Sequence, residues 1–237
     1  MPDHKMLRVS ATVLFLGVLI SSAAGMFHPG RENANDHLAA FSEYASSHHW
    51  TAIHLGQFAG MAVIVAGLVV LFFALDVHSG VPAWAGRFGA VSAVVALALY
   101  GVLQGVDGVA LKQAVDAWAK APEAEKAARF ASAETIRWLE WAIRSYQSFM
   151  LGLALILFAT MIGWTARAPR PIGYLMGLSG LAYFVQGWVL GSEGFSPANQ
   201  APTVLAVILV LAWSIWFVVI SWKEPVETRP TRASGRP

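Results

Sequence analysis

Histidine is concentrated just ahead of a long apolar run, where it could serve as a metal ligand. The segment SSHHWTAIHLGQFAG covers residues 46–60 and places His48, His49 and His54 before a run that reaches Leu75. Imidazole nitrogens combined with carboxylates suit zinc, copper and iron. The candidate ligands along the chain are His28, His37, His49 and His54, joined by Asp107 or Glu140. We expect His28, His49, His54 and Asp107 to supply the main ligands.

The spacing of these histidines identifies no particular kind of metal site. His49 and His54 are five residues apart, which is about 140° around an α-helix. They therefore do not form the one-face H-x-x-x-H pair of many zinc enzymes. A haem with two histidine ligands would need them to face each other inside a bundle, whereas these lie at its rim. A small transition-metal ion fits the pattern better than a haem.

Two carboxylates, Glu140 and Asp107, are candidates for catalytic acid–base chemistry. Arg137 and Arg144 flank Glu140 at i−3 and i+4, which should keep its carboxylate ionised. The same arrangement is typical of a structural salt bridge, so both interpretations stay open. Asp107 would accept a proton or bind the metal from the end of another helix.

Glutamines within apolar stretches indicate a site for an organic molecule. An unpaired amide in the hydrocarbon region is costly and normally faces the interior of a helix bundle. The amides in question are Gln57, Gln104, Gln147 and Gln186. In this interpretation they orient a small ligand, and Arg144 holds an anionic group on it.

The composition places all these residues in a membrane protein. Hydrophobic residues make up 57% of the 237 residues and charged residues only 13%, too few charges to cover a soluble globule. A membrane span needs about 20 apolar residues. Uncharged runs of that length occur at residues 9–27, 55–75, 88–106, 145–166, 171–192 and 203–222. We expect an all-α bundle of six transmembrane helices that forms a single domain over residues 1–222.

Basic residues predict how this bundle is oriented. Lysine and arginine gather at both termini and in two alternate connections, while the opposite short connections hold only Arg31. By the positive-inside rule, both termini lie in the cytoplasm. We expect a multi-pass protein of the cell inner membrane, with a disordered cytoplasmic tail over residues 223–237.

The connections on the outer side are expected to form helices of their own. Asn35 or Asp36 would cap a short amphipathic helix that carries Leu38 and Phe41 on one face. The long connection between the third and fourth spans reads as an outer helical hairpin, with Pro122 at a first helical position.

Counting along the spans predicts that the polar residues converge. A helix rises 1.5 Å per residue, so residues from four helices reach the outer membrane boundary within about one turn of a common plane. These residues are His28, His54, Asp107, Glu140 and Arg144. We therefore expect any site to open outward.

Several function classes are excluded. The chain has no cysteine, so thiolate ligands, disulfides and a cysteine nucleophile are ruled out. It contains neither a phosphate-binding glycine loop nor a G-x-S-x-G segment, and nothing indicates nucleic-acid binding. The expected partners are the lipid bilayer and a small molecule or metal ion, and an oligomer stays possible.

The layout also resembles a known kind of protein. An apolar helix, the outer segment HLAAFSEYASSHHW, a long second span, a helical excursion and a closing pair of spans follow one another over about residues 8–222. This order is similar to that of bacterial six-helix membrane proteins classed as domains of unknown function. The resemblance implies a one-domain prokaryotic inner-membrane protein, and it implies no catalytic residues.

Three functional interpretations follow from the sequence. The first is an outward-facing polar pocket that binds a small molecule or metal, with an unidentified activity. The second is a membrane enzyme that depends on zinc, copper or iron. In the third, the polar cluster is only a salt-bridge network in a structural or interaction subunit.

Overall fold

The computed structural model describes residues 4–165 and 167–223, and all regular secondary structure in them is helical. The all-α prediction is therefore confirmed for these residues. The long helices are α1 (His4–Met26), α3 (Trp50–Leu75), α4 (Gly80–Gly105), α6 (Glu123–Thr165), α7 (Arg170–Glu193) and α8 (Gln200–Trp222). The short ones are α2 (His37–Ser46), the π-helical η1 (Val106–Leu111), α5 (Lys112–Ala119) and the 3₁₀ turn η2 (Pro197–Asn199). The predicted tail lies outside the described residues, except for Lys223.

The chain is a multi-pass membrane protein. Among the described residues, five helices are long and apolar enough to cross a bilayer: α1, α3, the continuous α4–η1–α5 rod, α6, and α8 with its preceding 3₁₀ turn. The predicted span at residues 171–192 corresponds to α7, which does not reach that apolarity. Its glycines and Gln186 lower the mean hydropathy of the helix.

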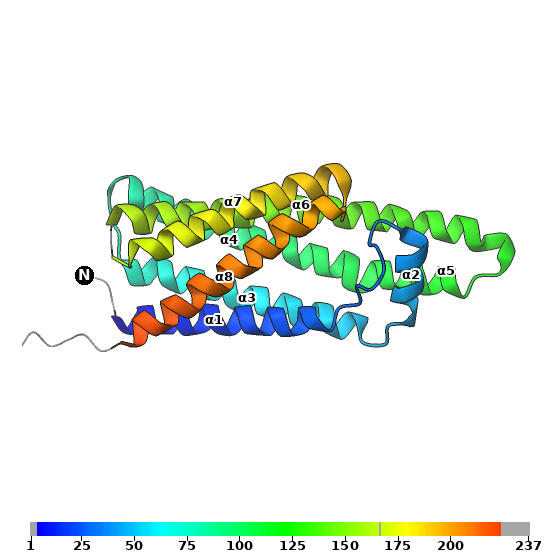
Figure 1. The fold of residues 1–237 in the computed structure, drawn as a ribbon, viewed down its shortest axis with the longest axis horizontal. Coiled ribbons are helices and arrows are strands. Elements are labelled where there is room, and N and C mark those ends of the chain that lie inside the picture. Colours follow the sequence, from blue (N-terminus) through cyan, green and yellow to red (C-terminus); the bar gives the residue numbers. More distant parts are fainter. Residues whose placement is uncertain (1–3, 166, 224–237) are drawn as a thin grey trace, which may run out of the picture.

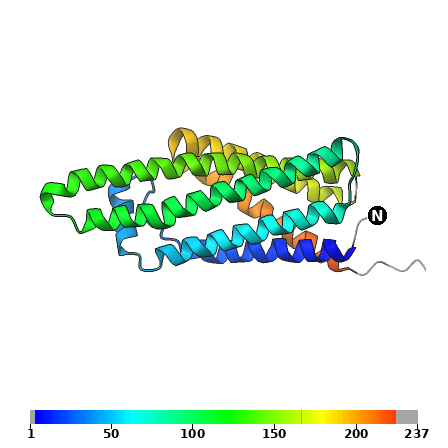
Figure 2. The ribbon, with the colours of Figure 1, turned by 180° about the vertical axis from the view of Figure 1, so that it is seen from behind.

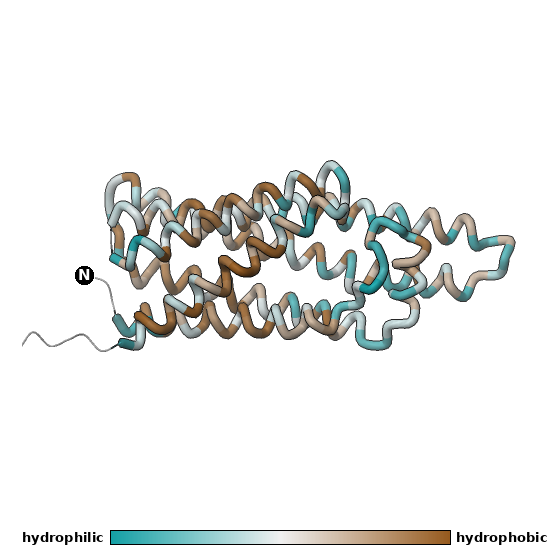
Figure 3. The backbone as a smooth tube through the Cα atoms, viewed as in Figure 1, coloured by the Kyte–Doolittle hydropathy of each residue, from teal (hydrophilic) through white to brown (hydrophobic). Residues whose placement is uncertain are grey.

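The molecule is long, with an apolar part and a polar end (Figure 3). At the end opposite to the start of α1, α5 and the first turns of α6 extend as an antiparallel hairpin beyond the other long helices (Figures 1 and 2). This hairpin lies where the sequence predicts one. Helix α6 begins at Glu123, one residue after Pro122.

Helix α2 covers one side of this polar end. The Asp36 side chain accepts a hydrogen bond from the Ala39 backbone N–H at 3.2 Å, so Asp36 rather than Asn35 is the N-cap. Phe41 and Tyr44 on its inner face are buried in a small apolar cluster with Leu111 and Trp50. This cluster fixes α2 against the hairpin and the start of α3.

Close helix packing needs small residues at specific positions. A Cβ on Gly17 of α1 would lie 2.6 Å from the backbone N of Ile64 in α3, and one on Gly152 of α6 would lie 2.7 Å from the Gly180 carbonyl oxygen of α7. Only glycine allows such approach between membrane helices. The contact at Gly17 sets the height of α3 against α1, and so the height of His54 relative to the end of α1.

Candidate metal centre

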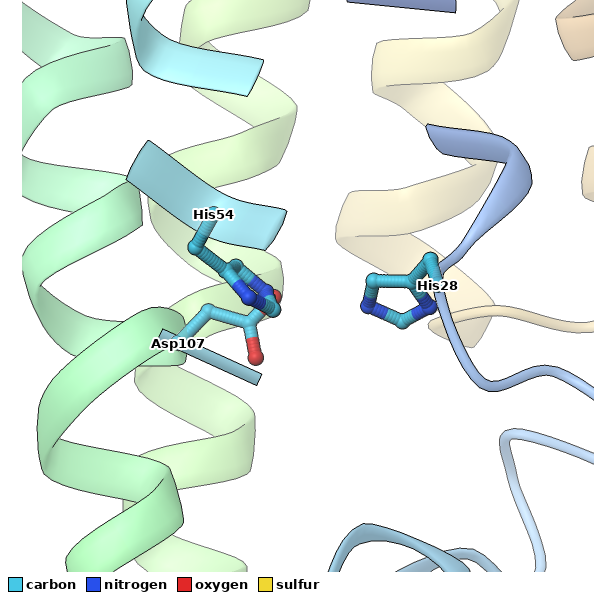
Figure 4. Close-up of side chains that lie close together, drawn as sticks. All are labelled: His28, His54 and Asp107. Carbon is cyan, nitrogen blue, oxygen red and sulfur yellow. The ribbon is translucent and has the colours of Figure 1, made fainter. Parts of the chain in front are cut away.

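Three side chains from separate segments meet at the boundary between the apolar bundle and its polar end. His28 lies in the loop after α1, His54 in the second turn of α3, and Asp107 in η1 (Figure 4). Each offers one ligand atom, and these atoms all lie within 4.8 Å of one another. The cluster thus combines two imidazoles with one carboxylate, a donor set that binds zinc or ferrous iron.

The hydrogen bonds of His54 determine which ring nitrogen can bind a metal. Its Nδ1 lies 2.7 Å from the Trp50 carbonyl oxygen, which can only accept, so Nδ1 carries the proton. Its Nε2 lies 3.0 Å from Asp107 Oδ2. In a neutral ring this nitrogen presents a lone pair to the carboxylate, so a proton or a cation must lie between them. Two ligands of one tetrahedral zinc ion are typically ~3.3 Å apart.

His28 is held in the same tautomer. Its Nδ1 donates to the Pro29 carbonyl oxygen at 2.6 Å, which leaves Nε2 as the ligand atom. Its ring centroid is 5.2 Å from that of His54, and the ring points across the gap toward His54 and Asp107 (Figure 4). Burial lowers the pKa of His28 below its usual value, against the opposing influence of Asp107. The neutral imidazole that a metal requires is therefore favoured.

Asp107 has an unused oxygen. Its Oδ1 is buried and has no hydrogen-bond partner among the described residues, while Oδ2 faces His54. A buried carboxylate oxygen without a partner is costly, and a bound cation relieves that cost.

The π-helical turn that presents Asp107 is held by α3. Trp50 Nε1 donates to the Asp107 carbonyl oxygen at 2.8 Å, and Thr51 Oγ1 donates to the Gly108 carbonyl oxygen at 3.0 Å. A Cβ on Gly108 would lie only 2.6 Å from His54 Cβ, so glycine is required there. Such π-helical turns are frequent at functional sites. The π-helical turn η1 and the hydrogen bonds of Trp50 and Thr51 are not predicted from the sequence, where the glycines of GVDGVA are the one local signal for them.

Glu140 lies beside the cluster but is not one of its three ligands. It is buried and pairs with Arg137 at 2.5 Å, and Arg137 also donates to the Tyr44 hydroxyl at 3.2 Å. Burial raises the pKa of Tyr44 to about 12, although Arg137 opposes this. The Tyr44 ring packs against Trp50, with the ring centroids 4.3 Å apart and the planes tilted by 42°. This chain of contacts joins α6 and α2 to the residue that orients His54.

The other histidines considered in the sequence analysis lie elsewhere. His49 is exposed and forms the N-cap residue of α3. His37 on α2 contacts Glu134 of α6 at 2.9 Å. Neither belongs to the group that could surround one ion among the described residues.

The predicted ligand-binding amides fall into two groups. Gln186 accepts from Ser148 at 3.1 Å and donates to Thr203 at 2.8 Å, so it ties α6, α7 and α8 together. Gln104 Oε1, Arg144 Nε and Gln147 Nε2 are instead buried without partners among the described residues. These three lie on the packed helices α4 and α6. Gln57 of α3 is half-buried.

An open pocket adjoins the cluster at His28. It has a volume of about 840 Å³ and lies between the loop after α1 and helix α2, and His28 is one of its lining residues. The others include Phe27, Arg31, Glu43 and Ser46. One ligand of the cluster is therefore in contact with space that a solute can enter.

A family described as a domain of unknown function (DUF4386) matches residues 9–220. No curated protein and no solved structure matches the chain.

Proposed function

We propose that this chain, which belongs to the DUF4386 family, is a membrane protein that binds one divalent transition-metal ion between His28, His54 and Asp107. The observation that carries the proposal is the contact of His54 Nε2 with Asp107 Oδ2 at 3.0 Å, made by a ring whose other nitrogen already donates. Zinc and ferrous iron fit two histidines and one carboxylate. A small ion suits this contact better than haem, because the carboxylate already faces the nitrogen that a haem iron would need.

The proposed centre has an open coordination position. Three protein ligands leave room for water or a substrate atom, as in catalytic zinc sites. Asp107 supplies one negative charge against the two positive charges of the ion, whereas Glu140 is already paired with Arg137. Hydroxide or an anionic small molecule would balance the remainder. It would enter from the pocket that His28 lines.

This open position favours a metal-dependent enzyme as the second candidate function. A metal-bound water has a strongly lowered pKa and becomes a nucleophile near neutral pH. Gln104, Arg144 and Gln147, with their unpartnered buried atoms, would hold polar groups of the ligand or the waters around it. Glu140 would accept a proton only after its pairing with Arg137 loosens.

The topology that we propose has six membrane spans, with α7 added to the five apolar helices. Helix α7 packs along α6 (Figure 1) and runs beside the apolar part of the bundle (Figure 3). With α7 as the sixth span, both termini lie on one side, which the distribution of basic residues makes the cytoplasm. The metal centre would then face the outer side of a bacterial inner membrane.

Elemental analysis of the purified protein tests the proposal. After reconstitution with zinc or ferrous iron and removal of loose metal, we expect about one ion per chain, and its loss in His54→Ala and in Asp107→Asn. His49→Ala is the matched control, because this exposed histidine lies near the site in sequence but outside the cluster. Equal metal content in the wild type and the His54 variant would refute the centre. Absence of bound metal in the wild type would favour the salt-bridge interpretation.

A further inference from the structure

A second pocket lies at the other end of the bundle, where the start of α1 lies close to the end of α8. It has a volume of about 190 Å³ and lies between the start of α1, the turn between α6 and α7, and the end of α8. Figure 1 shows these three segments at the same end of the molecule. The lining residues are His4, Leu7, Arg8, Arg167, Ala168, Pro169, Phe217, Ile220, Ser221 and Lys223. None of these ten is acidic.

Arg8 is fixed in place by contacts that do not neutralise its charge. Its Nε donates to the Ser221 carbonyl oxygen at 3.0 Å, and its guanidinium lies 5.5 Å from the centre of the Trp222 ring. Trp222 in turn donates to Thr12 at 3.1 Å. A guanidinium has five N–H donors, so one bond to a carbonyl leaves it able to bind an anion.

Arg167 is fixed in a similar way from another segment. Its Nη1 donates to the Leu75 carbonyl oxygen at 2.5 Å and also contacts the Asp76 carbonyl oxygen, at the end of α3. Lys223, just after α8, adds a third cation to the lining. Three positive groups from distant parts of the chain thus surround one small hollow. Their mutual repulsion favours an anion between them.

The surroundings of the pocket are those of a membrane interface. Trp84, Trp164 and Trp222 are exposed at this end of the bundle, as in the aromatic belt where side chains meet lipid headgroups. Leu7, Phe217 and Ile220 give the pocket an apolar side. Val9 and Val219 next to it are half exposed and continue that apolar surface along the helices.

We propose that this pocket binds the phosphate group of an anionic phospholipid. Arg8, Arg167 and Lys223 would hold the phosphate, while the acyl chains would lie along the apolar surface of α1 and α8. Basic pockets between membrane helices are suited to anionic headgroups. The bound lipid would bridge the start of α1, the residues before α7 and the end of α8, and it would therefore stabilise the folded bundle.

Thermal unfolding in neutral detergent tests this site. We expect phosphatidylglycerol to raise the Tm of the wild type by about a few degrees in a saturable manner, and zwitterionic phosphatidylcholine to have no such effect. The double variant Arg8→Gln/Arg167→Gln should lose the shift. Arg87→Gln is the matched control, because Arg87 lies at the same end of the bundle, over the Trp84 ring, and outside the pocket.

Further measurements separate the possible outcomes. If the double variant fails to fold, Lys223→Gln replaces it, since Lys223 is exposed and its loss should weaken the lipid shift several-fold. Native mass spectrometry should show retained phosphatidylglycerol on the wild type and less on the variants. Equal shifts with both lipids, or an undiminished shift in the pocket variants, would overturn the proposal. A shift reproduced by glycerol phosphate alone would assign the pocket to a soluble phosphate ester instead and would also overturn it.

Discussion

His54 faces Asp107 with Nε2, the ring nitrogen that makes no hydrogen bond to the backbone. Its Nε2 lies 3.0 Å from Asp107 Oδ2, and its Nδ1 lies 2.7 Å from the Trp50 carbonyl oxygen. Two species satisfy this geometry: a doubly protonated imidazolium, or a neutral ring that shares a cation with the carboxylate. The hydrogen bond from Nδ1 to a carbonyl is also how proteins commonly orient a metal-binding histidine. Only the second species is affected by metal removal, because the first contains no metal.

Metal removal should destabilise the wild type and leave Asp107→Asn unchanged. An ion that binds only the folded state stabilises it by about 2.7 kcal/mol at 100-fold excess over Kd. The variant keeps the shape of the side chain but loses the charge that the ion requires. Thermal unfolding with and without a chelator measures both effects. A chelator response of the same size in the two proteins would mean that the metal acts elsewhere.

Gly108→Ala should disturb the centre while all three ligands remain present. The new Cβ would lie 2.6 Å from His54 Cβ, so α3 and η1 must separate, at a cost of about 1–3 kcal/mol. We expect a lower Tm together with weaker metal binding. Gly105→Ala is the control, since its Cβ would meet nothing within 4 Å and should be neutral or stabilising by roughly 0.5–1 kcal/mol. Similar behaviour of the two variants would show that the close approach is unimportant.

The helices could be foreseen from the sequence because their signals are local. Apolar runs of membrane length and the cap at Asp36 depend only on neighbouring residues. Five of the six predicted runs are found as membrane-length apolar helices among the described residues, and Asp36 is the N-cap of α2. Which histidines meet depends instead on the relative rotation and height of different helices. His28 and His54 are brought together by the close packing of α1 on α3, and His49, only five residues from His54, is left exposed.

The π-helical turn was beyond local reasoning for the same reason. Its backbone carbonyl oxygens at Asp107 and Gly108 accept hydrogen bonds from Trp50 and Thr51, more than fifty residues away in sequence. An ordinary continuous helix was the simplest expectation for this segment. The pairing of Glu140 with Arg137 was foreseeable from their spacing of three, and it is present at 2.5 Å.

Removal of Arg137 should be much more harmful than removal of the whole Arg137–Glu140 pair. Both side chains are buried, so Arg137→Gln leaves the Glu140 carboxylate without its counterion, at a cost of about 3–5 kcal/mol. In Arg137→Gln/Glu140→Gln no buried charge is left unpaired. We expect the double variant to recover much of the lost free energy of unfolding. Denaturation of the wild type, the two single variants and the double variant measures this as a double-mutant cycle. Additive losses would show that the two residues do not depend on each other.

Labelling of single cysteines should reveal which helices cross the membrane. The chain has no cysteine of its own, so each introduced thiol reports one position. Ser46, Ser79 and Ser192 are exposed and lie at the end of α2, before α4 and near the end of α7. An impermeant maleimide applied to intact cells should label Ser46→Cys and Ser192→Cys, whereas Ser79→Cys should react only after permeabilisation. Among the described helices of membrane length, α7 alone lacks a stretch apolar enough for a span. The labelling of Ser192→Cys therefore determines whether the protein has six spans. If it reacts only from the inside while Ser46→Cys reacts from the outside, α7 does not cross and the six-span topology is wrong.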